Sequence, residues 1–331
     1  MNKREPFWDN AKILLMVLVV LGHIFPIDKT GSNLATYNLI FSFHMPLFVF
    51  ISGYFTKIDE HQKFWRGIGK LAETFIVFTI IHICVLLLQG ESFKENWLIV
   101  PRWTLWYLVS LICWRLILYY SPPVVLSNSR LVILLAFSLC LILGWIPVGK
   151  SFSFHRTFSF LPFFMLGYLS RRWPSWIDRG RIRPLLSIVC FVVIWLMWYV
   201  LRFNNTIILQ DFGYFHYDSP FGALVFRICY LILASVLSIC FLSLIPKKEY
   251  KWTHFGRYTL FVYMWHSVIL SWRYIIRDSF HIPTSFPFCV CYMVLVLFII
   301  YLMSRITIFH WILNPISWYL SKRKCNKYEK N

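Results

Sequence analysis

Long uninterrupted runs of apolar residues recur along the whole chain, and they constrain its fold more than any other feature. A run of about 17 to 25 apolar residues is long enough to cross the hydrocarbon core of a bilayer as a helix. Of the 331 residues, 59% are hydrophobic and only 14% are charged, and a soluble protein of this length could not bury so much apolar surface. The sequence therefore predicts an all-α integral membrane protein.

We expect a single transmembrane domain over residues 1–331, with an approximate core at 5–320 and a basic cytoplasmic tail at 321–331. The apolar run that follows the first residues has no small-residue cleavage site, so it is expected to remain as the first span. About ten spans are predicted, at residues 11–27, 36–56, 70–89, 104–120, 130–147, 157–170, 185–203, 222–245, 257–276 and 287–312.

Basic residues are distributed unevenly among the loops that connect these spans. With the N-terminus in the cytoplasm, 22 of the 33 Lys and Arg residues fall in cytoplasmic loops and 7 in loops on the other side. Cytoplasmic loops of membrane proteins carry such an excess. The asymmetry predicts an even number of spans with both termini cytoplasmic. It also explains the net charge of +19, because the basic loops would face the anionic lipids of the inner leaflet. The charge therefore does not indicate binding to nucleic acid.

The nine cysteines lie mostly inside apolar runs, and the chain has neither a CxxC pair nor a Cys/His ligand spacing. Free cysteines in such positions behave as small apolar packing residues. We therefore expect no metal site, no essential disulfide and no permanently bound cofactor.

Histidines interrupt four of the predicted spans, at His23, His44, His82 and His266. At a rise of about 1.5 Å per residue, each falls near the middle of its span, where an ionisable side chain is costly and needs a polar partner. A hydrogen bond to a neighbouring helix would meet that need, and this interpretation is favoured for His82 and His266. For His23 and His44 the surrounding residues favour a functional role.

His23 shares a helix with two charged residues near its predicted cytoplasmic end. Asp9 suits a helix start, and Lys12 follows it by three residues, so the two side chains can pair. His23 lies eleven residues beyond Lys12, about three helical turns, and therefore returns to nearly the same face. The pattern predicts a stripe that runs from a charged inner mouth to a buried imidazole.

The second span carries its own irregularities around His44. Pro46 removes a backbone hydrogen bond and bends a helix, which membrane spans tolerate where neighbours or water compensate. The Ser52-Gly53 pair has small side chains, which predicts that the backbone of another helix comes close at this point.

These motifs are similar to those of a known family. "DNAKILLMVLVVLGH" and "FHMPLFVFISGYF" resemble the first- and second-helix motifs of the membrane-bound acyltransferase 3 family. "WTLWYLVSLICWR", "RTFSFLPFFMLGYL" and "GRYTLFVYMWHSVIL" resemble later segments of its sugar O-acetyltransferase branch, which includes fucose 4-O-acetylase-like proteins. The resemblance implies about ten spans and a pore for the acyl donor. It also implies transfer of an acyl group, usually acetyl, from cytoplasmic acyl-CoA to a hydroxyl of an extracytoplasmic or lipid-linked glycan.

The resemblance also implies roles for the residues of the two motifs. His23 would be the general base for the acceptor hydroxyl, or a transient acyl carrier. Asp9 and Lys12 would shape the inner end of the donor channel. His44 would orient His23 or stabilise the developing oxyanion.

Two further sets of residues are candidates for substrate binding. Basic side chains on the cytoplasmic side could hold the phosphates of CoA. The candidates are Arg66, Lys70, Arg171 and Arg172. Cytoplasmic loops of membrane proteins are basic in any case, so these residues could also be there for topology alone. A second set of side chains could bind the sugar. The candidates are Arg156, Trp103, Trp106, Tyr107 and His266. Aromatic residues near the outer face also gather at membrane interfaces without binding a ligand.

The chain departs from the family pattern in two respects. Lys12 stands where arginine is common, so a bidentate guanidinium contact becomes a point charge. We also expect no C-terminal soluble esterase-like domain, which some cell-wall acetyltransferases of the family carry. The expectation is that the membrane domain delivers the acetyl group directly or passes it to a separate acetyl-accepting or glycan-assembly protein.

Two other functions remain open from the sequence. A secondary transporter of a sugar or anion is the main alternative, but such proteins usually bury carboxylates in their spans, and here the acidic residues fall almost entirely in loops. A non-catalytic membrane subunit of a polysaccharide assembly complex would not need the stripe from Asp9 to His23. The expected location is a bacterial plasma membrane.

Overall fold

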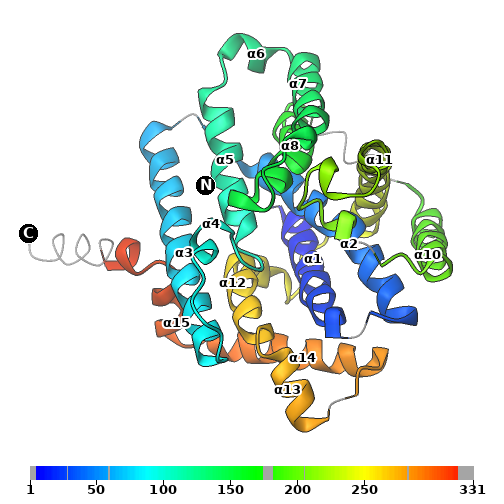
Figure 1. Cartoon of the computed structure of the whole chain (residues 1–331). Helices are drawn as coiled ribbons and strands as arrows, with labels where there is room; N and C mark the ends of the chain where they lie inside the picture. Colours follow the sequence, from blue (N-terminus) through cyan, green and yellow to red (C-terminus); the bar gives the residue numbers. More distant parts are fainter. Residues whose placement is uncertain are drawn as a thin grey trace, which may run out of the picture.

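The computed structural model describes residues 5–27, 29–58, 60–173, 182–204, 206–281 and 283–319. Within these ranges all regular secondary structure is helical (Figure 1), which confirms the predicted all-α fold class. The predicted basic tail at 321–331 lies outside the described residues.

Helix α1 (Pro6–Ile24) and helix α2 (Gly31–Phe55) occupy the centre of the molecule, together with α8 (Phe154–Ser170). Helices α2 and α8 cross with their backbones in contact. A Cβ atom added at Gly53 would collide with the carbonyl of Phe164, and one added at Gly167 would collide with the carbonyl of Phe50. The close approach that the Ser52-Gly53 pair predicts is therefore confirmed.

The remaining helices surround this centre. In Figure 1, α3 lies on one side, α10 on the opposite side, and α13 and α14 along the lower edge. The longer elements are α3 (His61–Leu88), α5 (Trp106–Tyr120), α7 (Ser129–Ile142), α10 (Pro184–Leu201), α11 (Pro220–Leu244), α12 (Thr259–Leu270) and α14 (Phe286–Met303). Shorter helices are α4 (Asn96–Ile99), α6 (Pro123–Ser127), α13 (Arg273–Phe280) and α15 (Thr307–Leu313). Single 3-10 turns are η1 (Phe25–Ile27), η2 (Leu143–Trp145), η3 (Ser151–Ser153), η4 (Thr206–Leu209), η5 (Tyr214–His216) and η6 (Thr253–Arg257).

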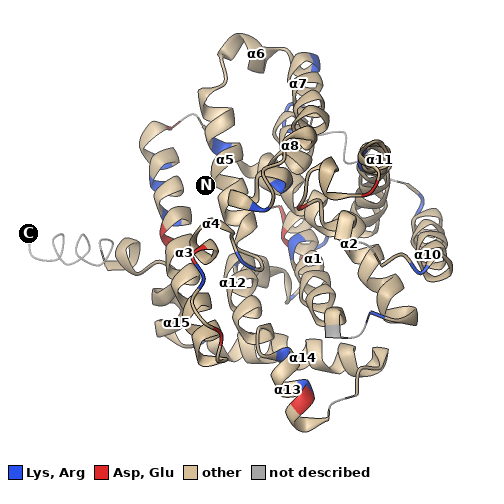
Figure 2. Ribbon diagram, in the orientation of Figure 1, with Lys and Arg blue, Asp and Glu red and all other residues tan. Residues whose placement is uncertain are grey.

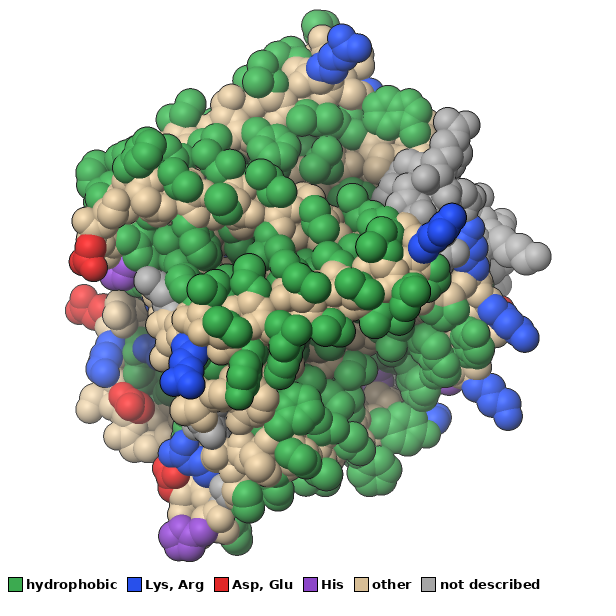
Figure 3. Space-filling model, turned by 90° about the vertical axis from the view of Figure 1, so that its right-hand side faces the viewer, with side chains coloured by type: hydrophobic (Ala, Val, Ile, Leu, Met, Phe, Trp, Pro, Cys, Tyr) green, Lys and Arg blue, Asp and Glu red, His purple; other side chains and the backbone are tan. Residues whose placement is uncertain are grey.

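The helices have the composition of membrane-spanning segments. Six of those described are long and apolar enough to cross a bilayer, and α5, α7 with η2, and α12 are shorter apolar helices. Figure 2 shows long stretches of helix without a charged residue, and Figure 3 shows hydrophobic side chains covering most of one face, with charged side chains mainly toward its margins. The chain is a helical membrane protein; the count of ten spans and their orientation stay predictions.

Helices lie within all ten predicted ranges, but several boundaries differ. Helix α1 ends at Ile24, one residue after His23, so His23 lies in the last turn of its helix rather than near the middle. The predicted span at 257–276 is divided between α12 and α13, with a break at Ser271 and Trp272. The predicted span at 287–312 ends early, because α14 stops at Met303 and places Arg305 in a turn.

Candidate active site

A cavity of about 160 Å³ lies between the last turn of α1 and the loops that are predicted to be outside the membrane. Helices α1, α2, α5, α8, α11 and α12 contribute to its wall, together with turns η1 and η4. The lining residues are His23, Pro26, Tyr37, Phe41, His44, Met45, Trp103, Trp106, Arg156, Phe160, Ile208, Leu209, Tyr230 and Tyr263. The fold thus brings together both motif histidines and the predicted acceptor-binding Arg156, Trp103 and Trp106.

His23 is partly buried, and its ring is fixed by its own helix. Its Nδ1 atom lies 2.7 Å from the carbonyl oxygen of Val19, one turn back. A carbonyl oxygen only accepts hydrogen bonds, so Nδ1 carries the proton and donates it. In the neutral ring the other nitrogen, Nε2, therefore holds a lone pair and can accept a proton.

His44 and His266 are held in the same way. Their Nδ1 atoms lie 2.7 Å from the carbonyl oxygen of Ile40 and 2.9 Å from that of Val262, respectively, and both Nε2 atoms are buried without a partner. The ring of His266 meets that of His23 edge-on at 5.2 Å between centroids. His266 is not among the cavity-lining residues, so the structure favours a supporting position beside His23 over direct contact with a sugar.

The ring of Phe41 contacts both motif histidines. Its ring centroid lies 5.7 Å from that of His23 and 4.7 Å from that of His44. His44 thus faces the cavity as a second hydrogen-bond acceptor rather than as a direct partner of His23. His82 instead bonds Ser267 at 3.1 Å, in keeping with the interpretation that it links two helices.

Arg156 brings a positive charge into the cavity wall from the first turn of α8. Its guanidinium donates to the carbonyl oxygen of Leu209 at 3.1 Å, lies 3.5 Å from Asp211, and stacks over the Trp106 ring at 5.0 Å. Asp211 also pairs with Lys150 at 2.8 Å. Arg156 is therefore anchored on one edge and exposed to the cavity on another.

Arg227 is not among the predicted site residues, although its place inside an apolar span was a usable signal. Arg227 is 3% exposed on α11 and binds the loop that crosses the cavity. Its guanidinium donates to the Gln210 side chain at 2.9 Å and to the carbonyl oxygens of Cys140 and Phe212, each at 3.2 Å. We call residues 206–219 the outer strap, since this segment supplies Ile208 and Leu209 to the cavity wall.

The aromatic candidates divide between the cavity and the core. Trp103 and Trp106 line the cavity, and Trp103 has a φ of +52°, a backbone region that non-glycine residues seldom adopt. Tyr107 is buried between helices, where its hydroxyl bonds that of Ser52, and it is not part of the cavity wall. Tyr37, Tyr230 and Tyr263 line the cavity without having been predicted.

At the other end of α1, Asp9 and Lys12 form the predicted pair, with 2.6 Å between carboxylate oxygen and Nζ. Both are largely buried, and Gly256 of η6 packs directly on Asp9, so that a Cβ atom added there would lie 2.7 Å from the Asp9 Cβ atom. The pair and His23 are thus at opposite ends of one helix, and Lys12 does not reach the cavity wall.

The predicted CoA-binding cations lie on two different elements. Arg66 and Lys70 are exposed on α3. Arg171 donates to the carbonyl oxygen of Thr56 at 2.5 Å, and Arg172 donates to that of Leu126 at 2.5 Å. The two arginines thus join helix ends, which is a structural use of their guanidinium groups.

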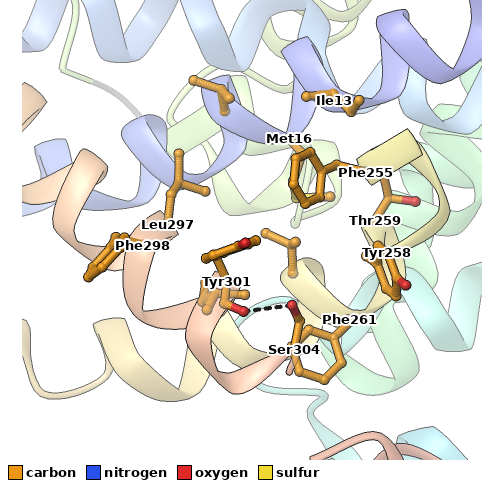
Figure 4. Close-up of a pocket in the computed structure, with 13 residues that line it drawn as sticks. Ile13, Met16, Phe255, Tyr258, Thr259, Phe261, Leu297, Phe298, Tyr301 and Ser304 are labelled. Atoms are coloured by element: carbon orange, nitrogen blue, oxygen red, sulfur yellow. Dashed lines mark hydrogen bonds between the residues drawn. The ribbon is translucent and has the colours of Figure 1, made fainter. Parts of the chain in front are cut away.

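A second hollow, which we call the inner groove, lies along the half of α1 that precedes His23. It measures about 340 Å³, and its lining residues are Ile13, Met16, Val17, Phe255, Tyr258, Thr259, Phe261, Val262, Leu297, Phe298, Ile300, Tyr301 and Ser304. Figure 4 shows aliphatic and aromatic side chains from α1, α12 and α14 pointing into one space. Phe298 is 55% exposed, so the groove opens on the outside of the helix bundle.

Comparison with known proteins identifies the family. A model of the acyltransferase 3 family, described as an acyltransferase domain, matches residues 5–305. The chain belongs to this family, which confirms the resemblance seen in the motifs and the expected class of enzyme at the level of the family.

One curated relative is the nodulation protein NolL of Mesorhizobium japonicum, which is 26% identical over 239 residues. The match covers 63% of this chain and 61% of NolL, so the chain spans less than two thirds of that relative. No solved structure matches the chain.

Proposed function

We propose that this protein transfers an acyl group, expected to be acetyl, from cytoplasmic acyl-CoA to a hydroxyl of an extracytoplasmic or lipid-linked glycan, with His23 as the general base. The family match supports acyl transfer to a hydroxyl. The observation that carries the role of His23 is its hydrogen bond to Val19, which leaves the Nε2 lone pair available in a cavity that opens toward the predicted outer side.

In the proposed reaction, the acceptor hydroxyl gives its proton to Nε2 of His23 while its oxygen attacks the thioester carbonyl carbon. A new C–O bond forms, the C–S bond breaks, and the proton then passes from His23 to the CoA thiolate. If His23 instead carries the acyl group, Nε2 attacks the thioester carbon and the C–S bond breaks to release the CoA thiolate. The acceptor oxygen then attacks the acyl carbon, the C–N bond to His23 breaks, and the hydroxyl proton passes to the thiolate.

The developing oxyanion needs a donor, and Arg156 is better suited to this than His44. The bond from His44 Nδ1 to Ile40 leaves its Nε2 without a proton in the neutral ring, so that atom accepts hydrogen bonds but cannot donate one. Arg156 presents N–H groups and a fixed positive charge to the same cavity. His44 then serves to accept a hydrogen bond from an acceptor hydroxyl.

The test supplies labelled acetyl-CoA to inside-out vesicles and follows the label into glycan. His23→Ala should lower transfer by about 10²- to 10⁴-fold, the range of a lost general base. His61→Ala is the matched control, since His61 is exposed at the start of α3. Unchanged transfer in His23→Ala would refute the assignment, and uptake of unmodified solute without label transfer would favour the transporter alternative.

A further inference from the structure

Three aromatic rings of the cavity wall are each covered by a cation. Arg156 lies 5.0 Å from the Trp106 ring centroid, and Arg273 lies 4.6 Å from that of Trp103. Lys29, which is remote from both in the sequence, lies 4.4 Å from the Tyr37 ring. Positive charge therefore gathers around the cavity from three separate elements.

These cations differ in how their charges are balanced. Arg156 shares the carboxylate of Asp211 with Lys150. Neither Lys29 nor Arg273 is paired with a carboxylate among the described residues. Asp211 thus balances Arg156 and Lys150, whereas Lys29 and Arg273 have no counterion from the described part of the chain.

Arg273 is in a position where an unbalanced charge is costly. It is 7% exposed, donates to the carbonyl oxygen of Leu270 at 2.9 Å and to the Tyr274 hydroxyl at 3.1 Å, and keeps a buried Nε–H without a partner. Burial of an arginine without a counterion is unfavourable unless another group supplies the negative charge.

Tyr274 links the elements that carry Lys29 and Arg273, because its hydroxyl accepts from Arg273 and donates to the carbonyl oxygen of Pro26, three residues before Lys29. Burial lowers the pKa of Lys29, and the positive charge of Arg273 lowers it further. Two like charges brought together at the edge of a substrate cavity form an arrangement that an anion would stabilise.

We propose that Lys29 and Arg273 bind an anionic group of the acceptor, a carboxylate or a phosphate, at the outer mouth of the His23 cavity. This inference rests on the proposed function, because it defines the class of glycan whose hydroxyl reaches His23. An acidic sugar would supply a carboxylate, and a sugar phosphate or lipid-linked glycan would supply a phosphate. In either case the anion holds the acceptor at the mouth while the aromatic walls hold its ring.

Binding without donor tests this inference independently of catalysis. Affinities of the full chain in lipid nanodiscs are measured for glucose, glucuronate and glucose 1-phosphate. Both anionic sugars, or one of them, should bind more tightly than glucose, and the advantage should fall as salt is raised. The stronger of the two identifies the carboxylate or the phosphate as the source of the charge. Equal binding of all three sugars would overturn the proposal.

Variants then locate the site. Lys29→Gln and Arg273→Gln should each lower the affinity for the preferred anionic sugar by about ten-fold and leave that for glucose unchanged. Arg273→Lys keeps the charge and should retain most of the preference, which separates an electrostatic role from packing. Arg202→Gln, an exposed arginine on the same predicted side, is the matched control. An unaltered preference in both Gln variants would refute the site.

Labelled acetyl transfer to neutral and anionic acceptors at equal rates would refute this inference and leave the proposed function intact. Tight anion binding without acetyl transfer would support this inference and refute the proposed function.

Discussion

The His23 cavity and the inner groove lie along the same helix, α1, yet they are built from opposite kinds of residue. The cavity wall carries two imidazoles and a guanidinium, and the outer strap beside it adds a buried ion pair with Asp211. The inner groove is lined by aliphatic and aromatic side chains, with hydroxyls as its polar groups. Imidazole and guanidinium side chains cost free energy inside a membrane protein, so their presence in the cavity wall marks the place where chemistry is expected.

The difference also shows what holds each region in shape. The groove needs only packing between apolar helices. The cavity depends on hydrogen bonds that cross long distances in the sequence, such as those from Arg156 to Leu209 in the outer strap and from Arg227 to Cys140. Substitutions should therefore affect the two regions unequally.

Arg227→Met should have the largest effect, because it removes three hydrogen bonds, one to the Gln210 side chain and two to the carbonyl oxygens of Cys140 and Phe212. We expect a loss of about 3 kcal/mol of stability and a raised KM for the acceptor, since the strap forms part of the cavity wall. Thermal unfolding in detergent and acceptor kinetics measure both effects. Arg202→Met, at an exposed position, controls for loss of charge. An unchanged acceptor KM would mean that the strap does not shape the site.

Arg156→Lys should have an intermediate effect. Lysine keeps the charge but cannot donate to Leu209, approach Asp211 and face the cavity at the same time. We expect kcat/KM for the acceptor to fall by about 10²-fold, the scale of a lost oxyanion donor, with little change in the KM for acyl-CoA. Steady-state kinetics with each substrate varied in turn separates the effect on the acceptor from the effect on acyl-CoA. An increase in the acyl-CoA KM alone would place Arg156 on the donor side.

Phe298→Ala, in the inner groove, should have the smallest effect. The side chain is 55% exposed at the rim, so its removal leaves no closed cavity inside the protein. Acceptor kinetics should change by no more than about two-fold, which corresponds to a change of under about 0.5 kcal/mol. Acceptor assays in the same vesicles provide the measurement. A large fall in acceptor kcat/KM would show that the groove and the cavity are functionally connected, and the contrast between them would then fail.

The sequence by itself determined the helical membrane fold, because the length and composition of apolar runs report directly on the energetics of crossing a bilayer. Local spacing also determined the Asp9–Lys12 pair and the close approach at Gly53, since each depends on residues within one helix or on the absence of a side chain. The motif histidines could be singled out for the same reason, as polar groups in apolar runs.

Only the tertiary structure decided which side chains share the cavity. Spacing along α2 does not reveal that Phe41 contacts both His23 and His44, nor that His266 from α12 meets His23. The outer strap reaches the site through Arg227, 17 positions from Gln210 in the sequence. These contacts depend on how separate helices pack and where their loops return, and no pattern within a single segment encodes that geometry.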